Sequence, residues 1–126
     1  MSDEVRDELK YTETHEWIKL KGDNVLVGIT DHAQSELTDI VFVELPEVGR
    51  ELKKGEELCV VESVKSVSEI YSPVSGKITA INEKLEDSPE TINESPYDDG
   101  WIVEIQVKNM EEIKKMLSAD EYKRTL

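Results

Sequence analysis

Lys65 is the residue whose setting most suggests a chemical role. Two strand-like segments, residues 57–63 and 66–71, meet across the dipeptide Val64-Lys65. If that dipeptide is the centre of a tight turn, the chain forms a hairpin that carries the lysine at its tip. The pairing would then set Ser63 opposite Ser66 and Glu62 opposite Val67.

The composition of this turn does not by itself prove the hairpin. Residues 63–66 contain no glycine, asparagine or aspartate, which are the residues that usually mark a tight turn. An apolar Val64 at an exposed tip also breaks the usual pattern, and such breaks are typical of functional sites. The alternative is an ordinary exposed lysine on one continuous strand.

The chain offers little for catalysis by its own side chains. It has two histidines, His15 and His32, and one cysteine, Cys59, and none has the spacing of a metal site. It contains no glycine-rich phosphate loop and no Gly-x-Ser-x-Gly elbow. Cys59 has apolar neighbours, which predicts a buried thiol, and His15 is most simply a strand histidine with an ordinary hydrogen bond. We therefore predict a protein that is not an enzyme, holds no metal and takes its chemistry from a cofactor.

The overall charge narrows the classes of partner. The 126 residues carry a formal net charge of -14, and 37% of them are hydrophobic. An acidic surface repels nucleic acid and anionic membranes and favours protein partners with basic docking faces, although solubility alone would also explain it. No segment has the length and apolar character of a membrane span, and residues 1–8 do not resemble a targeting sequence. We therefore expect a cytoplasmic protein, unless a presequence was already removed.

Short strands between glycine and proline turns dominate the middle of the chain. They are expected near residues 15–20, 25–29, 39–45, 57–63, 66–71, 77–81 and 101–107. The first two form a hairpin around residues 21–24, and Thr30 can cap a short helix over residues 31–36. Residues 82–100 are expected to be an acidic loop. The pattern predicts a mainly β fold, a small barrel or sandwich.

The two ends of the chain differ from its middle. Residues 1–10 are expected to be a loose N-terminal segment, and residues 11–126 one domain. Helices are expected from about residue 109, because Asn109 with Glu112 and Ser118 with Glu121 have the spacing of capping boxes. An apolar stripe would pack this segment onto the core, and it comprises Met110, Ile113, Met116 and Leu117.

Lys65 lies in the run Glu62-Ser63-Val64-Lys65-Ser66-Val67-Ser68-Glu69-Ile70-Tyr71-Ser72-Pro73-Val74-Ser75-Gly76, which strongly resembles the lipoylation site of the H-protein family of the glycine cleavage system. The resemblance runs from about Tyr11 to Tyr122. Its further blocks are Tyr11-Thr12-Glu13-Thr14-His15-Glu16-Trp17, residues 28–30, 33–34, 37, 39–41, 43–46, 93–97 and 100–101. It implies a flattened barrel-sandwich hybrid of the lipoyl/biotinyl-domain type, with the modified lysine at a hairpin turn.

Two positions depart from the family pattern. Thr38 stands where glycine is common, and Ser66 stands where alanine is common after the modified lysine. Both replacements are small side chains. Thr38 argues against a backbone conformation at that position that only glycine could adopt.

The resemblance also implies a cofactor and partners. Lipoate would be joined to the Lys65 amine as an amide, leaving a flexible arm that ends in a dithiolane. Glycine decarboxylase (the P protein) would load an aminomethyl group onto the arm, the aminomethyltransferase (T protein) would remove it, and the dihydrolipoyl dehydrogenase (L protein) would reoxidise the dithiol. Lys65 would then be an attachment point in a non-catalytic carrier of glycine catabolism.

Enzymes that attach lipoate are further implied partners. Candidates for their recognition are the residues flanking the lysine, namely Glu62, Val64, Ser66 and Glu69. For Glu62 and Glu69, a role as solvated strand carboxylates is an equal alternative.

Other carriers share part of this pattern. A biotin carrier normally has methionines beside its lysine, where this chain has Val64 and Ser66. The lipoyl domain of a 2-oxo acid dehydrogenase lacks the blocks at residues 11–17 and 93–97 and the helical tail. An H-like protein that relays lipoyl groups, another lipoyl carrier and a non-carrier interaction domain remain alternatives.

Overall fold

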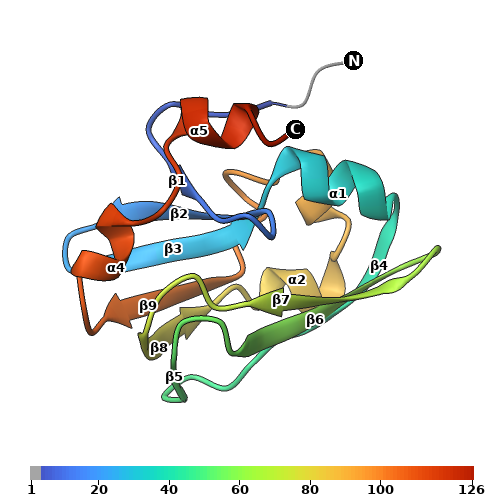
Figure 1. Ribbon diagram of the computed structural model, residues 1–126. Helices are drawn as coiled ribbons and strands as arrows, with labels where there is room; N and C mark the ends of the chain where they lie inside the picture. The colour runs from blue at the N-terminus through green and yellow to red at the C-terminus, as the bar shows by residue number, and fades with distance from the viewer. Residues whose placement is uncertain (1–3) are drawn as a thin grey trace.

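Two antiparallel sheets enclose the main core in the computed structural model, which describes residues 4–126 (Figure 1). The larger sheet has the strand order β1-β2-β3-β9-β8-β5, and the smaller has the order β4-β6-β7. The strands are β1 Lys10–Tyr11, β2 Glu16–Lys21, β3 Asn24–Ile29, β4 Ile40–Glu44, β5 Glu51–Leu52, β6 Glu57–Ser63, β7 Val67–Tyr71, β8 Gly76–Ile81 and β9 Val103–Val107. The helices are α1 Asp31–Leu37, α2 Lys84–Asp87, α3 Thr91–Glu94, α4 Glu111–Lys114 and α5 Ala119–Lys123.

This arrangement confirms the predicted mainly β, flattened sandwich. Side chains alternate across each strand, so the inward positions of both sheets meet in one apolar cluster. Its members on the larger sheet include Val25, Val27 and Ile105, and those on the smaller sheet include Val43 and Val61. Cys59 lies in the same cluster, as predicted, and burial raises the pKa of its thiol to about 12.

Local sequence signals account for the first hairpin and helix. Lys21 pairs with Asn24, and Gly22 occupies the first turn position with φ of 65°, which a two-residue turn of type II′ requires. Thr30 Oγ1 accepts a hydrogen bond from the Ala33 amide (3.2 Å) and caps α1 as predicted. None of the helices described for residues 4–126 has the length and apolar character to cross a membrane.

Three short elements had no clear signal in the sequence. The two-residue strand β5 pairs with β8, and residues 82–100 contain the one-turn helices α2 and α3 where we expected only loop. Neither helix has a side-chain N-cap, but Leu85 and Ile92 on them are fully buried. Burial of these two side chains therefore holds the helices in place, and capping does not.

A second apolar cluster covers the outer side of β2. Glu16, Trp17 and Ile18 are consecutive in β2 and are all buried, so both faces of the strand are covered at this end. The indole of Trp17 donates hydrogen bonds to the carbonyls of Ile29 and Pro96, both at 3.0 Å. The cluster therefore buries the face that a simple two-layer fold would leave in water, and its buried members are Leu9, Tyr11, Trp17, Tyr97, Ala119 and Tyr122.

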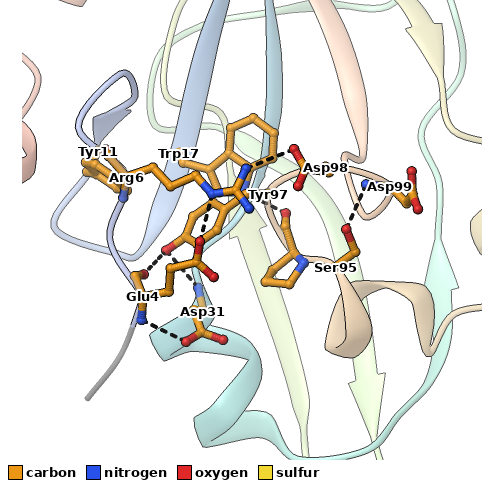
Figure 2. A network of polar contacts seen from close by, with 10 residues as sticks. Glu4, Arg6, Tyr11, Trp17, Asp31, Ser95, Tyr97, Asp98 and Asp99 are labelled. Carbon is orange, nitrogen blue, oxygen red and sulfur yellow. Dashed lines mark hydrogen bonds and ion pairs between the residues drawn. The ribbon is translucent and has the colours of Figure 1, made fainter.

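The N-terminal segment is irregular but held in place from residue 4 (Figure 2). Arg6 pairs with Asp98 at 2.9 Å and lies over the ring of Tyr97, whose hydroxyl donates to the Glu4 carbonyl. Leu9 is buried in the second cluster. Residues 4–10 thus make defined contacts with the region around Tyr97, and residues 1–3 lie outside the described residues. The division into a loose N-terminal segment and one domain stays a prediction.

The C-terminal helices confirm one predicted cap and correct the other. Ser118 and Glu121 form a capping box at the start of α5. Asn109 and Glu112 do not, because both carboxylate oxygens of Glu112 bond to Ser75, at 2.7 and 2.8 Å. Of the predicted stripe, Ile113 and Met116 are buried and Leu117 packs on the second cluster, whereas Met110 is exposed.

Thr38 at the end of α1 has the backbone conformation that we argued against. Its φ of 65° and ψ of -146° lie in a region that glycine adopts readily and a β-branched residue adopts only with strain. Its amide still bonds to the Gln34 carbonyl at 3.0 Å, and its carbonyl accepts from Asn93 Nδ2 at 2.8 Å. Contacts on both sides thus impose a conformation that local preference opposes.

Replacing Thr38 with glycine should therefore stabilise the protein. Relief of the strain outweighs the extra freedom that glycine gives the unfolded chain, so we expect the free energy of unfolding to rise by about 1 kcal/mol. Urea denaturation of both proteins measures it. Thr79→Gly, inside β8, is the control and should destabilise by about 1 kcal/mol. A loss of stability in Thr38→Gly would refute the strain.

Candidate functional site

The hairpin between β6 and β7 carries Lys65 at its tip. Glu62 pairs with Val67, and the Ser63 amide donates to the Ser66 carbonyl at 2.8 Å, so the predicted register is confirmed. The hydroxyl of Ser63 accepts from the amides of Lys65 (3.1 Å) and Ser66 (3.0 Å) and donates to the Ser66 carbonyl (3.2 Å). The Ser63 hydroxyl therefore stabilises a tight turn that contains no glycine or asparagine.

The Lys65 side chain is exposed and lightly held. Its ammonium donates one hydrogen bond, to the Glu36 carbonyl near the end of α1, at 3.1 Å. Within residues 4–126, no carboxylate lies within ion-pair distance of this ammonium. The amine is thus accessible to a reagent and does not have to be withdrawn from a salt bridge.

A second contact joins the tip to the corner between α1 and β4. The Val64 amide donates to the Asp39 carbonyl at 3.0 Å. The next residue along, Ile40, donates its amide to Asn93 Oδ1 at 2.9 Å, and Asn93 Nδ2 reaches the Thr38 carbonyl and Gln34 Oε1. Two elements distant in sequence therefore fix the base of the lysine hairpin.

These supporting residues were not selected as site residues from the sequence. Asn93 lies in the late block of the family resemblance, but its three bonds depend on the packing of α3 beside α1. The contact made by Asp39 is through a backbone carbonyl, which any residue type would present. Motif position could have pointed to either residue, because Asp39 also lies in a block of the resemblance, but it could not have revealed the contact through the Asp39 backbone carbonyl.

The four flanking candidates lie around Lys65 in different settings. Val64 and Ser66 are exposed on either side of it at the tip. Glu62 is half-buried at the end of β6, and Glu69 is exposed on β7, where it accepts from the Tyr71 hydroxyl at 3.0 Å. The structure therefore brings all four to the hairpin, and a role in recognition stays a prediction.

The two histidines lie close together, away from the hairpin tip. Their rings are 4.6 Å apart, and His15 Nδ1 hydrogen-bonds the Tyr122 hydroxyl at 2.8 Å. His15 precedes β2 with φ of 70°, so it is a turn residue and not the predicted strand residue. Among residues 4–126, no group of three or more histidine, cysteine or carboxylate side chains is placed to bind a metal ion.

A cleft of about 540 Å³ opens where β7 ends, beside the residues that lead into β2. Its lining includes Tyr71, Ser72, Thr14, Lys54 and the buried residue Glu16. Burial raises the pKa of Glu16, while hydrogen bonds from Thr12, Thr14 and the Tyr71 amide oppose the rise. The strand that leaves the lysine hairpin thus leads to a concave surface containing a largely desolvated acid.

Together these features define a class of protein. A two-sheet scaffold displays an exposed lysine at the tip of the β6–β7 hairpin. A carrier domain of the lipoyl and biotinyl type is the class of protein that the family resemblance predicts for such a scaffold.

Comparisons with known proteins identify the family within this class. A model of the family described as glycine cleavage H-protein matches residues 9–126. Glycine cleavage system H proteins of Saccharophagus degradans and Halalkalibacterium halodurans are 56% and 55% identical to the chain over 124 and 120 residues. These matches span 98% and 95% of this chain, and 95% and 94% of the two relatives.

A solved structure agrees with the sequence matches. The crystal structure of a glycine cleavage system H protein from Mycobacterium marinum superposes with a TM-score of 0.86 at 40% sequence identity, covering 94% of this chain and 95% of that one. The chain belongs to the glycine cleavage H-protein family.

Removing the Ser63 hydroxyl should loosen the tip. Ser63→Ala deletes an acceptor for two backbone amides, and we expect a loss of about 1–2 kcal/mol in the free energy of unfolding. Amide hydrogen exchange at Lys65 and Ser66 should become faster. Ser68→Ala, on β7 in the same hairpin, is the control and should leave the exchange at these amides unchanged. Unchanged exchange in Ser63→Ala would show that the hydroxyl does not order the turn.

The buried Glu16 should make stability depend on pH. Because its pKa is raised on folding, its contribution is full below the ordinary value of 4.5 and is lost as pH rises through the folded-state pKa. The unfolding free energy of the unaltered protein, relative to Glu16→Gln, should therefore fall as pH rises above 4.5. Chemical denaturation across pH 4 to 8 measures this difference, since it brackets the ordinary carboxyl range.

Glu13→Gln controls for the loss of one negative charge in the same loop, because Glu13 is exposed. A difference between the unaltered protein and Glu16→Gln that stays constant with pH would contradict the raised pKa.

Proposed function

We propose that this chain is the lipoyl carrier of the glycine cleavage system, with lipoate attached through an amide to Lys65. In this role it takes an aminomethyl group from glycine decarboxylase to the aminomethyltransferase and passes electrons to the dihydrolipoyl dehydrogenase. The observation that carries the proposal is the accessible Lys65 amine at the tip of a firmly supported hairpin. The family membership of the chain supports the choice of lipoate and of these partners. We also propose that the protein is cytoplasmic, as the sequence predicts.

The residues around Lys65 fit such a group. Acylation removes the charge of the amine but leaves one N–H, which can still donate to the Glu36 carbonyl. Val64 and Ser66 are small and exposed, so they leave the approach to the amine open. When attached, lipoate supplies a dithiolane that accepts the aminomethyl group and two electrons.

The scaffold contributes position and reach. Its sheets and the Asn93 contacts fix the base of the arm, while the arm itself searches the space around the tip. Tethering keeps the reactive end at a high effective concentration near a docked enzyme. Lys65 acts here as an anchor, and it neither donates nor removes a proton in the transfer steps.

The cleft beside Glu16 is a suitable shelter for the loaded end of the arm. Its lining includes the apolar residues Met116 and Pro73. Glu16 also borders it, but this side chain is 1% exposed and its oxygens already accept from Thr12, Thr14 and the Tyr71 amide. The contribution of the cleft would therefore be its walls, which would reduce the contact of the loaded end with water.

Mass spectrometry of the protein from its native host tests the attachment. We expect a lipoyl mass increment that maps to Lys65, and reconstitution with the three partner enzymes should restore glycine cleavage. Lys65→Arg should abolish glycine cleavage completely, because a guanidinium is not acylated, while the unfolding midpoint stays unchanged at this exposed site.

Lys77→Arg, at another exposed lysine on β8 outside the cleft beside Glu16, is the matched control and should retain full turnover. A biotinyl adduct, or turnover by Lys65→Arg, would reject the assignment. Transfer of the lipoyl group to other proteins without glycine cleavage would favour the relay function instead.

A further inference from the structure

Exposed apolar side chains gather around the lysine hairpin. In the described part of the chain, eight large hydrophobic side chains are exposed, and half of them belong to this region. They are Val41 (53% exposed), Phe42 (48%), Val64 (69%) and Val67 (63%). Single exposed hydrophobic residues are ordinary on a protein surface, but a group of them at one functional point indicates an interaction surface.

The strand register places these side chains on one face. Phe42 pairs with Glu62 and Glu62 pairs with Val67, so the three form a row across β4, β6 and β7. Their neighbours Val43 and Val61 are buried, so this row points away from the core. The next outward row contains Glu44, Val60 and Glu69.

Two further features extend this face to the tip. The register shifts between Ile40 and Phe42, so Val41 is an extra residue that is also exposed. Val64 follows β6 and is bonded to the Asp39 carbonyl, which keeps it beside the start of β4. In Figure 1 the three strands form one sheet whose β6–β7 hairpin projects beyond the rest of the molecule.

The charges on this face have one sign apart from the lysine itself. Residues 39–44 and 57–71 contain no arginine and no lysine except Lys65. The acids on or beside the outward rows are Asp39, Glu44, Glu62 and Glu69. The face thus has a central row in which Glu62 lies between the apolar Phe42 and Val67, and an acidic rim around this row. It matches a partner whose apolar surface is bordered by lysine or arginine.

We propose that this face is the docking surface for the enzyme that attaches the lipoyl group, and that Phe42 and Val67 are its apolar anchors. The inference rests on the proposed function of Lys65. In the attachment step the Lys65 amine loses a proton, attacks the carbonyl of a lipoyl adenylate and releases AMP. The amide forms only one side chain's length from the hairpin backbone, so this enzyme has to close over the hairpin.

Enzymes that act later in the cycle work at the far end of the arm. They can therefore stand further from the β4–β6–β7 face than the attaching enzyme can. The need for close cover selects the attaching enzyme as the occupant, and the acidic rim gives its chemistry: an apolar pocket edged with basic side chains.

Steady-state lipoylation of the full-length protein tests the proposal, with a purified ATP-dependent lipoate ligase, lipoate and ATP as reactants. Phe42→Ser with Val67→Thr should raise KM for the carrier about tenfold, because anchor residues dominate an interface. Since the reacting amine is unaltered, kcat should change less than KM. Glu62→Gln should raise KM less and weaken its dependence on salt.

Leu20→Ser is the matched control, since Leu20 is as exposed (53%) but lies on β2. It should leave KM unchanged, and thermal unfolding should show that all variants fold. Phe42→Leu, with Val67 unaltered, keeps an apolar side chain at the anchor position. Its KM for the carrier should be close to that of the unaltered protein.

The outcomes separate this inference from the proposed function. If the unaltered protein is lipoylated at Lys65 and the Phe42/Val67 variant has the same KM, the docking surface is refuted and the carrier function stands. If the unaltered protein is never lipoylated at Lys65, the carrier function fails first. A dimer that the double variant abolishes, without any change in KM, would assign the face to a second copy and also refute the inference.

Discussion

The side-chain amide of Asn93 fixes the turn between α1 and β4, beside which the lysine hairpin projects. Its nitrogen bonds to the end of α1 and its oxygen to the start of β4, so one planar group spans the turn between them. The carbonyl of Asp39, within that turn, then receives the Val64 amide of the hairpin tip. Positioning of Lys65 thus depends on a side chain nearly thirty residues further along the chain, and the same contacts keep Thr38 in an unfavourable conformation.

Much of the fold could be predicted because its strands have simple signals. The hairpin of β2 and β3, the helix capped by Thr30 and the box of Ser118 with Glu121 each depend on residues close in sequence. Helices α2 and α3 could not be predicted, since burial of Leu85 and Ile92 holds them and neither has a cap. The contacts of residues 4–10 and the covered face of Trp17 could not be predicted for the same reason, because both depend on Tyr97.

The candidate site was likewise only partly predictable from the sequence. The register of the Lys65 hairpin followed from counting residues across a two-residue turn, and the family pattern chose the lysine. The Ser63 hydroxyl, the Asp39 carbonyl and the buried carboxylate of Glu16 act through contacts that form only in the folded chain. Thr38 shows the limit of judging backbone shape from residue type, because tertiary contacts overrode its local preference.

The burial of Cys59 has a consequence for the redox chemistry of such a carrier. A thiolate attacks disulfides, and a dithiolane arm on Lys65 would be a disulfide tethered to the same hairpin. Cys59 lies on β6 only six residues before Lys65, but its side chain belongs to the core and its thiol has a pKa of about 12. The chain therefore keeps its single thiol protonated and out of reach, so a dithiolane arm on Lys65 would not be trapped as a mixed disulfide with its own scaffold and would stay available for exchange with other proteins.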